Sequence, residues 1–137
     1  MNHRYLDEGR GSTCTVTVRL TADDLMALQA QVNTPALADR PIYYAFFDFA
    51  EVSDVDISSP QLRGTAQHAV DASQFSSVRR IVAIHAKHGV PFGLGRIWEV
   101  FIRKTGWECD VFRDRSQAVA WLRARALMKF GIQIELE

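Results

Sequence analysis

The sequence predicts an α/β fold in which one mixed sheet of about five strands packs with four helices. Three observations lead to this prediction: alternating β-branched segments near the start, short runs that are apolar on both faces, and longer segments with apolar residues three or four apart. The segments follow one another in the order β-β-α-β-α-β-α-β-α. After an opening hairpin, strands and helices alternate, which is typical of a sheet whose later strands are mainly parallel.

Composition points to one soluble domain that spans residues 1–137, because no repeat or linker divides the chain. Sixteen basic and sixteen acidic residues give a net charge of zero, which argues against a general nucleic-acid binder. No apolar run approaches the roughly 20 residues that cross a bilayer. Two cysteines make neither a disulfide framework nor a zinc site. We therefore expect a cytoplasmic protein without integral membrane association.

The first strand prediction covers residues 13–20, which alternate with period two. Cys14, Val16, Val18 and Leu20 share one face of this strand, while threonines and an arginine occupy the other. Residues 3–9 alternate more weakly before a glycine-rich turn. We expect the two segments to pair as a hairpin.

Helix starts are marked by capping residues in the first half of the chain. Thr21 is a suitable N-cap for a helix whose apolar pattern ends at Pro35. Residues 41–49 are apolar on both faces, as in a central strand. Ser59 is then expected as the N-cap of a second helix, with Pro60 at the first helical position.

The second half continues the alternation of strands and helices. Residues 79–84 form a short apolar strand, and a helix follows from Pro91. Residues 107–112 form a strand, and Asp114 begins the last helix. The tail, residues 131–137, alternates again and is expected to form an edge strand or a contact between subunits.

Residues 91–122 carry a family resemblance, in the segments PFGLGRIWEVF and GWECDVFRDRSQAVAWL. They resemble the C-terminal half of small bacterial STAS proteins, which are SpoIIAA-like. The order of elements is also similar to that of the STAS fold. The resemblance implies a STAS (SpoIIAA-like) fold and a role in binding other proteins rather than an enzymatic activity. It rests on these residues: Phe92, Gly93, Arg96, Phe112, Arg113, Asp114, Ala118, Trp121 and Leu122.

The same resemblance implies a phosphorylation site at a helix start. In the antagonist branch of the family, a partner kinase modifies a serine in an aspartate-serine-serine-glycine setting. Here Ser58 matches the modified serine, Asp48 the aspartate that ends a strand, and Asp56 the aspartate of the loop. Ile57 and Ser59 stand where that pattern has serine and glycine. The alternative is that Ser58 and Ser59 serve only to cap the helix.

Charge is distributed unevenly along the chain. Residues 1–60 contain nine acidic and four basic residues, and residues 61–137 contain seven acidic and twelve basic ones. The two parts therefore carry net charges of −5 and +5, with four acids between positions 48 and 56. One interpretation is an acidic binding surface beside Ser58, or a self-complementary dimer. The other is that acids and bases interleave once the chain folds.

A second functional hypothesis places a small-ligand or lipid site at residues 92–98. Two glycines in this segment permit close backbone approach, and Arg96 supplies a positive charge. Phe92, Gly93 and Trp98 complete this candidate site. The alternative is that the glycines let the helix pack tightly against the sheet while Arg96 pairs with an acidic residue.

Catalytic patterns give little support for an enzyme. His85 and His88 are three residues apart, but the sequence has no metalloprotease motif. Cys14 and Cys109 lie on strand faces and are expected to be buried small hydrophobes. We expect no cofactor and no metal. The sequence thus favours a protein-interaction or regulatory domain with a protein partner, acting as a homodimer.

Overall fold

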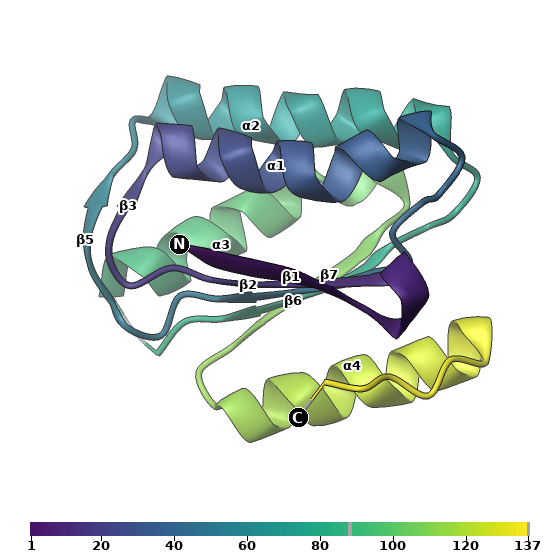
Figure 1. Cartoon of the computed structure of the whole chain (residues 1–137). Coiled ribbons are helices and arrows are strands. Elements are labelled where there is room, and N and C mark those ends of the chain that lie inside the picture. Colours follow the sequence, from purple (N-terminus) through teal and green to yellow (C-terminus); the bar gives the residue numbers. More distant parts are fainter. Residues whose placement is uncertain (88, 137) are drawn as a thin grey trace.

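The computed structural model describes residues 1–87 and 89–136, which form a mixed five-stranded sheet with helices on both faces (Figure 1). The strand order is β1-β2-β4-β6-β7, so the predicted α/β class and main sheet are confirmed. None of the helices in these ranges is long and apolar enough to cross a membrane. The main elements are β1 (Asn2–Leu6), β2 (Gly11–Thr15), α1 (Ala22–Leu37), β4 (Tyr44–Asp48), α2 (Ser59–Ala72), β6 (Ile81–His85), α3 (Gly89–Phe101), β7 (Glu108–Phe112) and α4 (Arg115–Phe130).

The helices divide unequally between the two faces of the sheet. Helices α1, α2 and α3 cover one face, and α4 with the C-terminal tail covers the other (Figure 1). Strands β2, β4, β6 and β7 are parallel and adjacent in chain order. Right-handed crossovers that always advance in one direction place their helices on one side of a sheet. Helix α4 follows the last strand and makes no crossover, so it is free to cover the opposite face.

The predicted hairpin is confirmed. Strand β1 pairs antiparallel with β2, with Asn2 opposite Thr15 and Leu6 opposite Gly11. Glycine is required at position 11 because the ring of Tyr44 occupies the space that a Cβ would fill. The Tyr44 hydroxyl beyond it donates a hydrogen bond to the buried carboxylate of Asp7.

The expected single strand over residues 13–20 is wrong, because the chain breaks after β2. A separate strand, β3 (Val18–Thr21), pairs in parallel with β5 (Val52–Asp56) in a second, two-stranded sheet. Val18 adopts a positive φ of 68° and is 66% exposed, so it does not share a face with Cys14. In the sequence, apolar and polar residue types keep alternating across this break. A period of two in the sequence therefore does not reveal where β2 ends and β3 begins.

Two helix boundaries also differ from the sequence prediction. Ser58, not Ser59, is the N-cap of α2, because Gln61, three residues on, completes a capping box with it. Helix α1 begins at its predicted cap but continues past Pro35 to Leu37. Pro35 has no N–H to donate to the carbonyl of Gln31, and the Tyr5 hydroxyl donates to that carbonyl instead, at 2.7 Å.

The C-terminal tail forms no strand within residues 131–136. It folds back over the α4 face of the sheet, where Ile132 and Leu136 are only 4% and 1% exposed beside Tyr44 and Phe46. The backbone N–H of Glu135 donates to Asp7. The apolar residues of the tail therefore pack within their own chain, which removes one of the two observations behind the homodimer prediction, the other being the uneven charge of the two parts of the chain.

Candidate functional site

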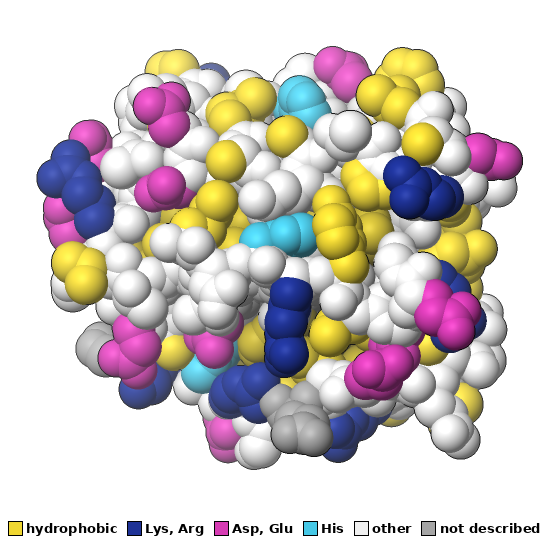
Figure 2. Space-filling model, viewed as in Figure 1, with side chains coloured by type: hydrophobic (Ala, Val, Ile, Leu, Met, Phe, Trp, Pro, Cys, Tyr) yellow, Lys and Arg dark blue, Asp and Glu magenta, His cyan; other side chains and the backbone are white. Residues whose placement is uncertain are grey.

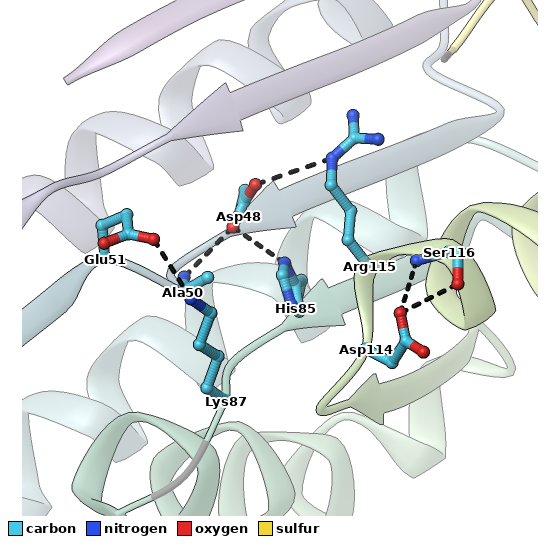
Figure 3. Close-up of polar contacts among 8 residues, drawn as sticks. All are labelled: Asp48, Ala50, Glu51, His85, Lys87, Asp114, Arg115 and Ser116. Carbon is cyan, nitrogen blue, oxygen red and sulfur yellow. Dashed lines mark hydrogen bonds and ion pairs between the residues drawn. The ribbon is translucent and has the colours of Figure 1, made fainter.

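The carboxyl ends of two central strands bring a carboxylate and an imidazole together. Asp48 ends β4 and lies in register with His85, which ends β6. The Asp48 Oδ1 atom lies 3.1 Å from His85 Nδ1 and accepts from the backbone N–H of Ala50 at 3.1 Å (Figure 3). Arg115, the first residue of α4, places its Nε 3.9 Å from Asp48 Oδ2. We call Asp48, His85 and Arg115 the Asp48 cluster.

Burial holds this cluster in one geometry. The His85 side chain is 6% exposed and that of Asp48 is 18% exposed, whereas Arg115 extends into solvent. Sequence reasoning identified Asp48 but not its pairing with His85. The available signal was that both residues end apolar strands, since the carboxyl ends of adjacent parallel strands meet at one edge of a sheet.

The segment from Asp56 to Ser59 lies at the other end of β5 from Asp48. Asp56 ends β5, and Ser58 and Ser59 are exposed in the first turn of α2. Five extended residues span about 16 Å, so β5 separates the two groups. The predicted residues thus form two locations: the Asp48 cluster, and a helix start that contains Asp56, Ser58 and Ser59. We call residues 56–61 the α2 start.

Basic partners neutralise the acidic stretch between positions 48 and 56. Arg19 contacts Asp54 at 3.4 Å and Asp56 at 2.8 Å. Glu51 contacts Lys87 at 3.3 Å (Figure 3). Figure 2 likewise shows acidic and basic side chains intermixed on the face in view. The structure follows the alternative in which acids and bases interleave, so the negative excess of the sequence does not become an acidic surface beside Ser58.

A surface groove lies beside the β4–β5 turn and β5. It has a volume of about 620 Å³ and lies between residues 49–55 and the segment that contains Lys87, Gly89, Val90 and Pro91. Its lining combines backbone of the β4–β5 turn with both polar and apolar side chains. The β4–β5 turn is therefore accessible to another molecule.

The alternative ligand site at residues 92–98 is not assembled around one pocket. Arg96 pairs with Glu99 at 3.3 Å and Asp110 at 3.5 Å. A Cβ on Gly95 would lie 3.2 Å from Val111, so this glycine packs against the sheet. Gly93 has open space instead, and Phe92 lies beneath the guanidinium of Arg113 at 4.4 Å.

The predicted ligand site consists of Phe92, Gly93, Arg96 and Trp98. Of these four residues, only Trp98 lines the nearby apolar cavity. The cavity lies between α1, α2, α3 and the sheet and has a volume of about 40 Å³. Pockets for drug-sized ligands measure roughly 300–1,000 Å³. A lipid or similar ligand would require the three helices to move apart, and the ligand hypothesis stays a prediction.

The two cysteine thiols are not activated as nucleophiles. Burial raises the pKa of the Cys14 thiol to about 11 and raises that of Cys109 as well, so both thiols stay protonated. Among residues 1–87 and 89–136, no three histidine, cysteine, aspartate or glutamate side chains are placed to hold a metal ion. His88, the second residue of the histidine pair, lies outside the described residues.

Comparison with known proteins returns a single kind of similarity. No protein-family model and no curated protein matches the chain. Among solved structures, the anti-sigma factor antagonist SpoIIAA in its unphosphorylated form is similar, with 11% sequence identity and a TM-score of 0.49. The match covers 83% of this chain and 90% of that one.

Proposed function

We propose that the protein is a non-enzymatic, STAS-like regulatory domain that binds a protein partner through the β4–β5 turn, β5 and the α2 start. The observation that carries this proposal is the exposure of the α2 start. Residues 58–61 are all exposed, and they follow a two-stranded sheet that is separate from the main sheet. Such a surface can change its contacts without repacking the core.

Arg19 forms ion pairs beside the α2 start. It lies on β3 and contacts both Asp54 and Asp56 on the neighbouring β5. These exposed ion pairs contribute little free energy. Arg19 compensates one of the two negative charges next to Ser58, and a phosphate there would meet less like-charge repulsion than the two carboxylates alone would cause.

Ser58 is the residue at which we propose a phosphorylation switch. Its hydroxyl accepts from the backbone N–H of Gln61 at 3.2 Å, at the positive end of the α2 dipole. A phosphoryl group at this position would keep an acceptor for that N–H and add nearly two negative charges. The surface would change from weakly to strongly negative while the helix keeps its cap.

The proposal places the protein in the cytoplasm, where its two free cysteines stay reduced. Whether it acts as a homodimer is a separate prediction. Sedimentation of the protein at tens of micromolar distinguishes a monomer from a dimer. A monomer at that concentration would contradict the homodimer prediction.

Affinity capture from native cells tests the proposal. Wild type is compared with Ser58→Asp, Arg63→Glu on the exposed side of α2, and Met128→Glu as a control on α4. Captured proteins are quantified by mass spectrometry at physiological salt. A partner retained by wild type and the control but lost from both α2 variants supports the proposal. Equal capture by all four, or no partner at all, contradicts it.

Intact-mass measurement of the protein from native cells tests the switch independently. The expected result is one added phosphate that maps to Ser58 and disappears in Ser58→Ala. Absence of that phosphate under every growth condition would exclude the switch and leave the partner surface in place.

A further inference from the structure

A polar groove lies on the α4 face of the sheet, beside the edge that α4 does not cover. It has a volume of about 230 Å³, and its polar lining comes from Asn2, Arg4, Thr13, Thr15, Asp48 and Arg115. The buried ring of Phe46 also lines it. This groove is separate from the β4–β5 turn and the α2 start.

Strand register explains why these side chains converge. Asn2, Thr15 and Asp48 lie opposite one another across β1, β2 and β4, and Arg4, Thr13 and Phe46 form the next row on the same face. Neighbouring strands are about 4.8 Å apart, so the backbone of Arg4 is about 10 Å from that of Phe46. The Arg115 guanidinium lies 5.3 Å from the centre of the Phe46 ring. Two guanidinium groups therefore approach the groove from opposite sides.

Both guanidinium groups have unused donors. In the part of the chain that the structure describes, Arg4 has no carboxylate within 4.0 Å, and Arg115 has only Asp48, at 3.9 Å. Arg125 differs, because it donates to both oxygens of Glu108 at 2.7 and 3.1 Å. The hydroxyls of Thr13 and Thr15 likewise form no side-chain hydrogen bond within residues 1–87 and 89–136.

Among the described residues that line the groove, the one acid, Asp48, already has polar partners. Asp48 Oδ1 accepts from the Ala50 N–H and lies 3.1 Å from His85 Nδ1, so one of its two oxygens has its partners outside the groove. The lining then offers two permanent positive charges, two hydroxyls and the Asn2 amide to a ligand. This set of donors suits a compact anion with several oxygens.

We propose that this groove binds a phosphate-class oxyanion, either free phosphate or the phosphate of a small monoester. Arg4 and Arg115 supply the charge, and Thr13 and Thr15 supply neutral donors between them. Asp48 limits the affinity through like-charge repulsion, and its pairing with His85 reduces that effect. The proposal is independent of the partner surface at the α2 start.

Titration of the purified full chain with inorganic phosphate, at constant ionic strength, tests the proposal. Amide chemical shifts of β1, β2 and the first turn of α4 are the readout. Arg4→Gln and Arg115→Gln should each weaken binding at least about tenfold, because each removes charge-assisted hydrogen bonds. The matched control is Arg63→Gln, an exposed arginine on the opposite helical layer, which should bind as wild type does. Circular dichroism confirms that each variant is folded.

Two further arms sharpen the outcome. Asp48→Asn should tighten binding, since it removes the negative charge from the groove. Glycerol phosphate replaces inorganic phosphate in the second arm, and a lower Kd for it identifies a monoester as the ligand class. Shifts confined to other surfaces, equal loss in Arg63→Gln, weaker or unchanged binding in Asp48→Asn, or no saturable binding of either probe would overturn the proposal.

Discussion

The guanidinium of Arg80 lies over the ring of Trp107, 4.2 Å from its centre, and is only 5% exposed. No carboxylate within the described ranges pairs with it. Its Nη1 donates to Asn33 Oδ1 and its Nη2 donates to the carbonyl of Val32, both at 2.9 Å. A longer bond of 3.4 Å reaches the carbonyl of Ile42. A single buried cation thus connects α1, the segment before β4 and the residue before β7.

Replacing Arg80 should therefore destabilise the fold strongly. Arg80→Met keeps the side-chain volume but leaves Asn33 Oδ1 and two carbonyls without a buried donor. We expect a loss of about 2–4 kcal/mol in the free energy of unfolding, measured by urea denaturation. Arg80→Lys should also lose stability, because an ammonium group cannot reproduce the planar stacking on Trp107. Arg63→Met, an exposed control, should stay within about 0.5 kcal/mol of wild type.

Ser58 and Ser59 should differ in their contribution to stability. Ser58 caps α2, so Ser58→Ala should cost about 1 kcal/mol. Ser59 is the first helical residue and caps nothing, so Ser59→Ala should be close to neutral or slightly stabilising. Thermal unfolding of the two variants distinguishes them. The opposite order would assign the cap to Ser59.

Gly93 and Gly95, both inside α3, make a matched pair. A Cβ on Gly93 would meet open space, so Gly93→Ala should stabilise the protein by about 0.5–1 kcal/mol through helix propensity. A Cβ on Gly95 would lie 3.2 and 3.3 Å from the methyl groups of Val111. Gly95→Ala should therefore stabilise the protein less than Gly93→Ala does, or destabilise it. Equal stabilisation by both, in denaturant unfolding, would show that α3 moves freely away from the sheet.

Glu135 should make stability depend on pH. The neighbouring Asp7 carboxyl raises the pKa of Glu135 above its ordinary value of 4.5. The folded chain therefore holds this proton more tightly than the unfolded chain does. The stability of wild type relative to Glu135→Gln should fall as the pH rises through 4.5 and the range just above it. Melting temperatures of both proteins between about pH 4 and 7 test this.

Glu108 provides a control, because its effect on stability should depend on pH in the opposite direction to that of Glu135. Hydrogen bonds from Arg125 hold the pKa of Glu108 below its ordinary value. Its contribution to stability is present above pH 4.5, the ordinary pKa of a glutamate. That contribution is lost as the pH falls through the lowered pKa of the folded state. Glu108→Gln should thus be less stable than wild type near neutral pH, and the difference should shrink in acid.

The sequence was informative wherever a local signal decided the structure. The hairpin of β1 and β2 follows from alternation interrupted by glycines, and Thr21 caps α1 through Asp24 as its residue type predicts. The five main strands and four helices are each marked by periodicity within a short segment. Local propensity and tertiary packing agree at these positions.

Sequence reasoning failed where a distant residue supplied the missing interaction. The break at Val18 depends on its pairing with Val52 of β5, 34 positions later. Helix α1 continues past Pro35 because Tyr5 donates to the carbonyl that the proline leaves free. The contact between Asp48 and His85 required the register of β4 and β6. Pattern within one segment carries no information on such pairings.

The hydrogen bond from Glu135 to Asp7 joins positions 128 residues apart and has a topological consequence. It holds the beginning and the end of the chain side by side on the α4 face. Asn2 and Leu136 line one groove, so a short linker that joins residues near these two positions would close the chain into a ring. New ends opened in the β4–β5 turn, at the exposed Glu51, would give a circular permutant with the same main sheet. In such a permutant the α2 start would lie close to the new N-terminus, tethered by only a few residues.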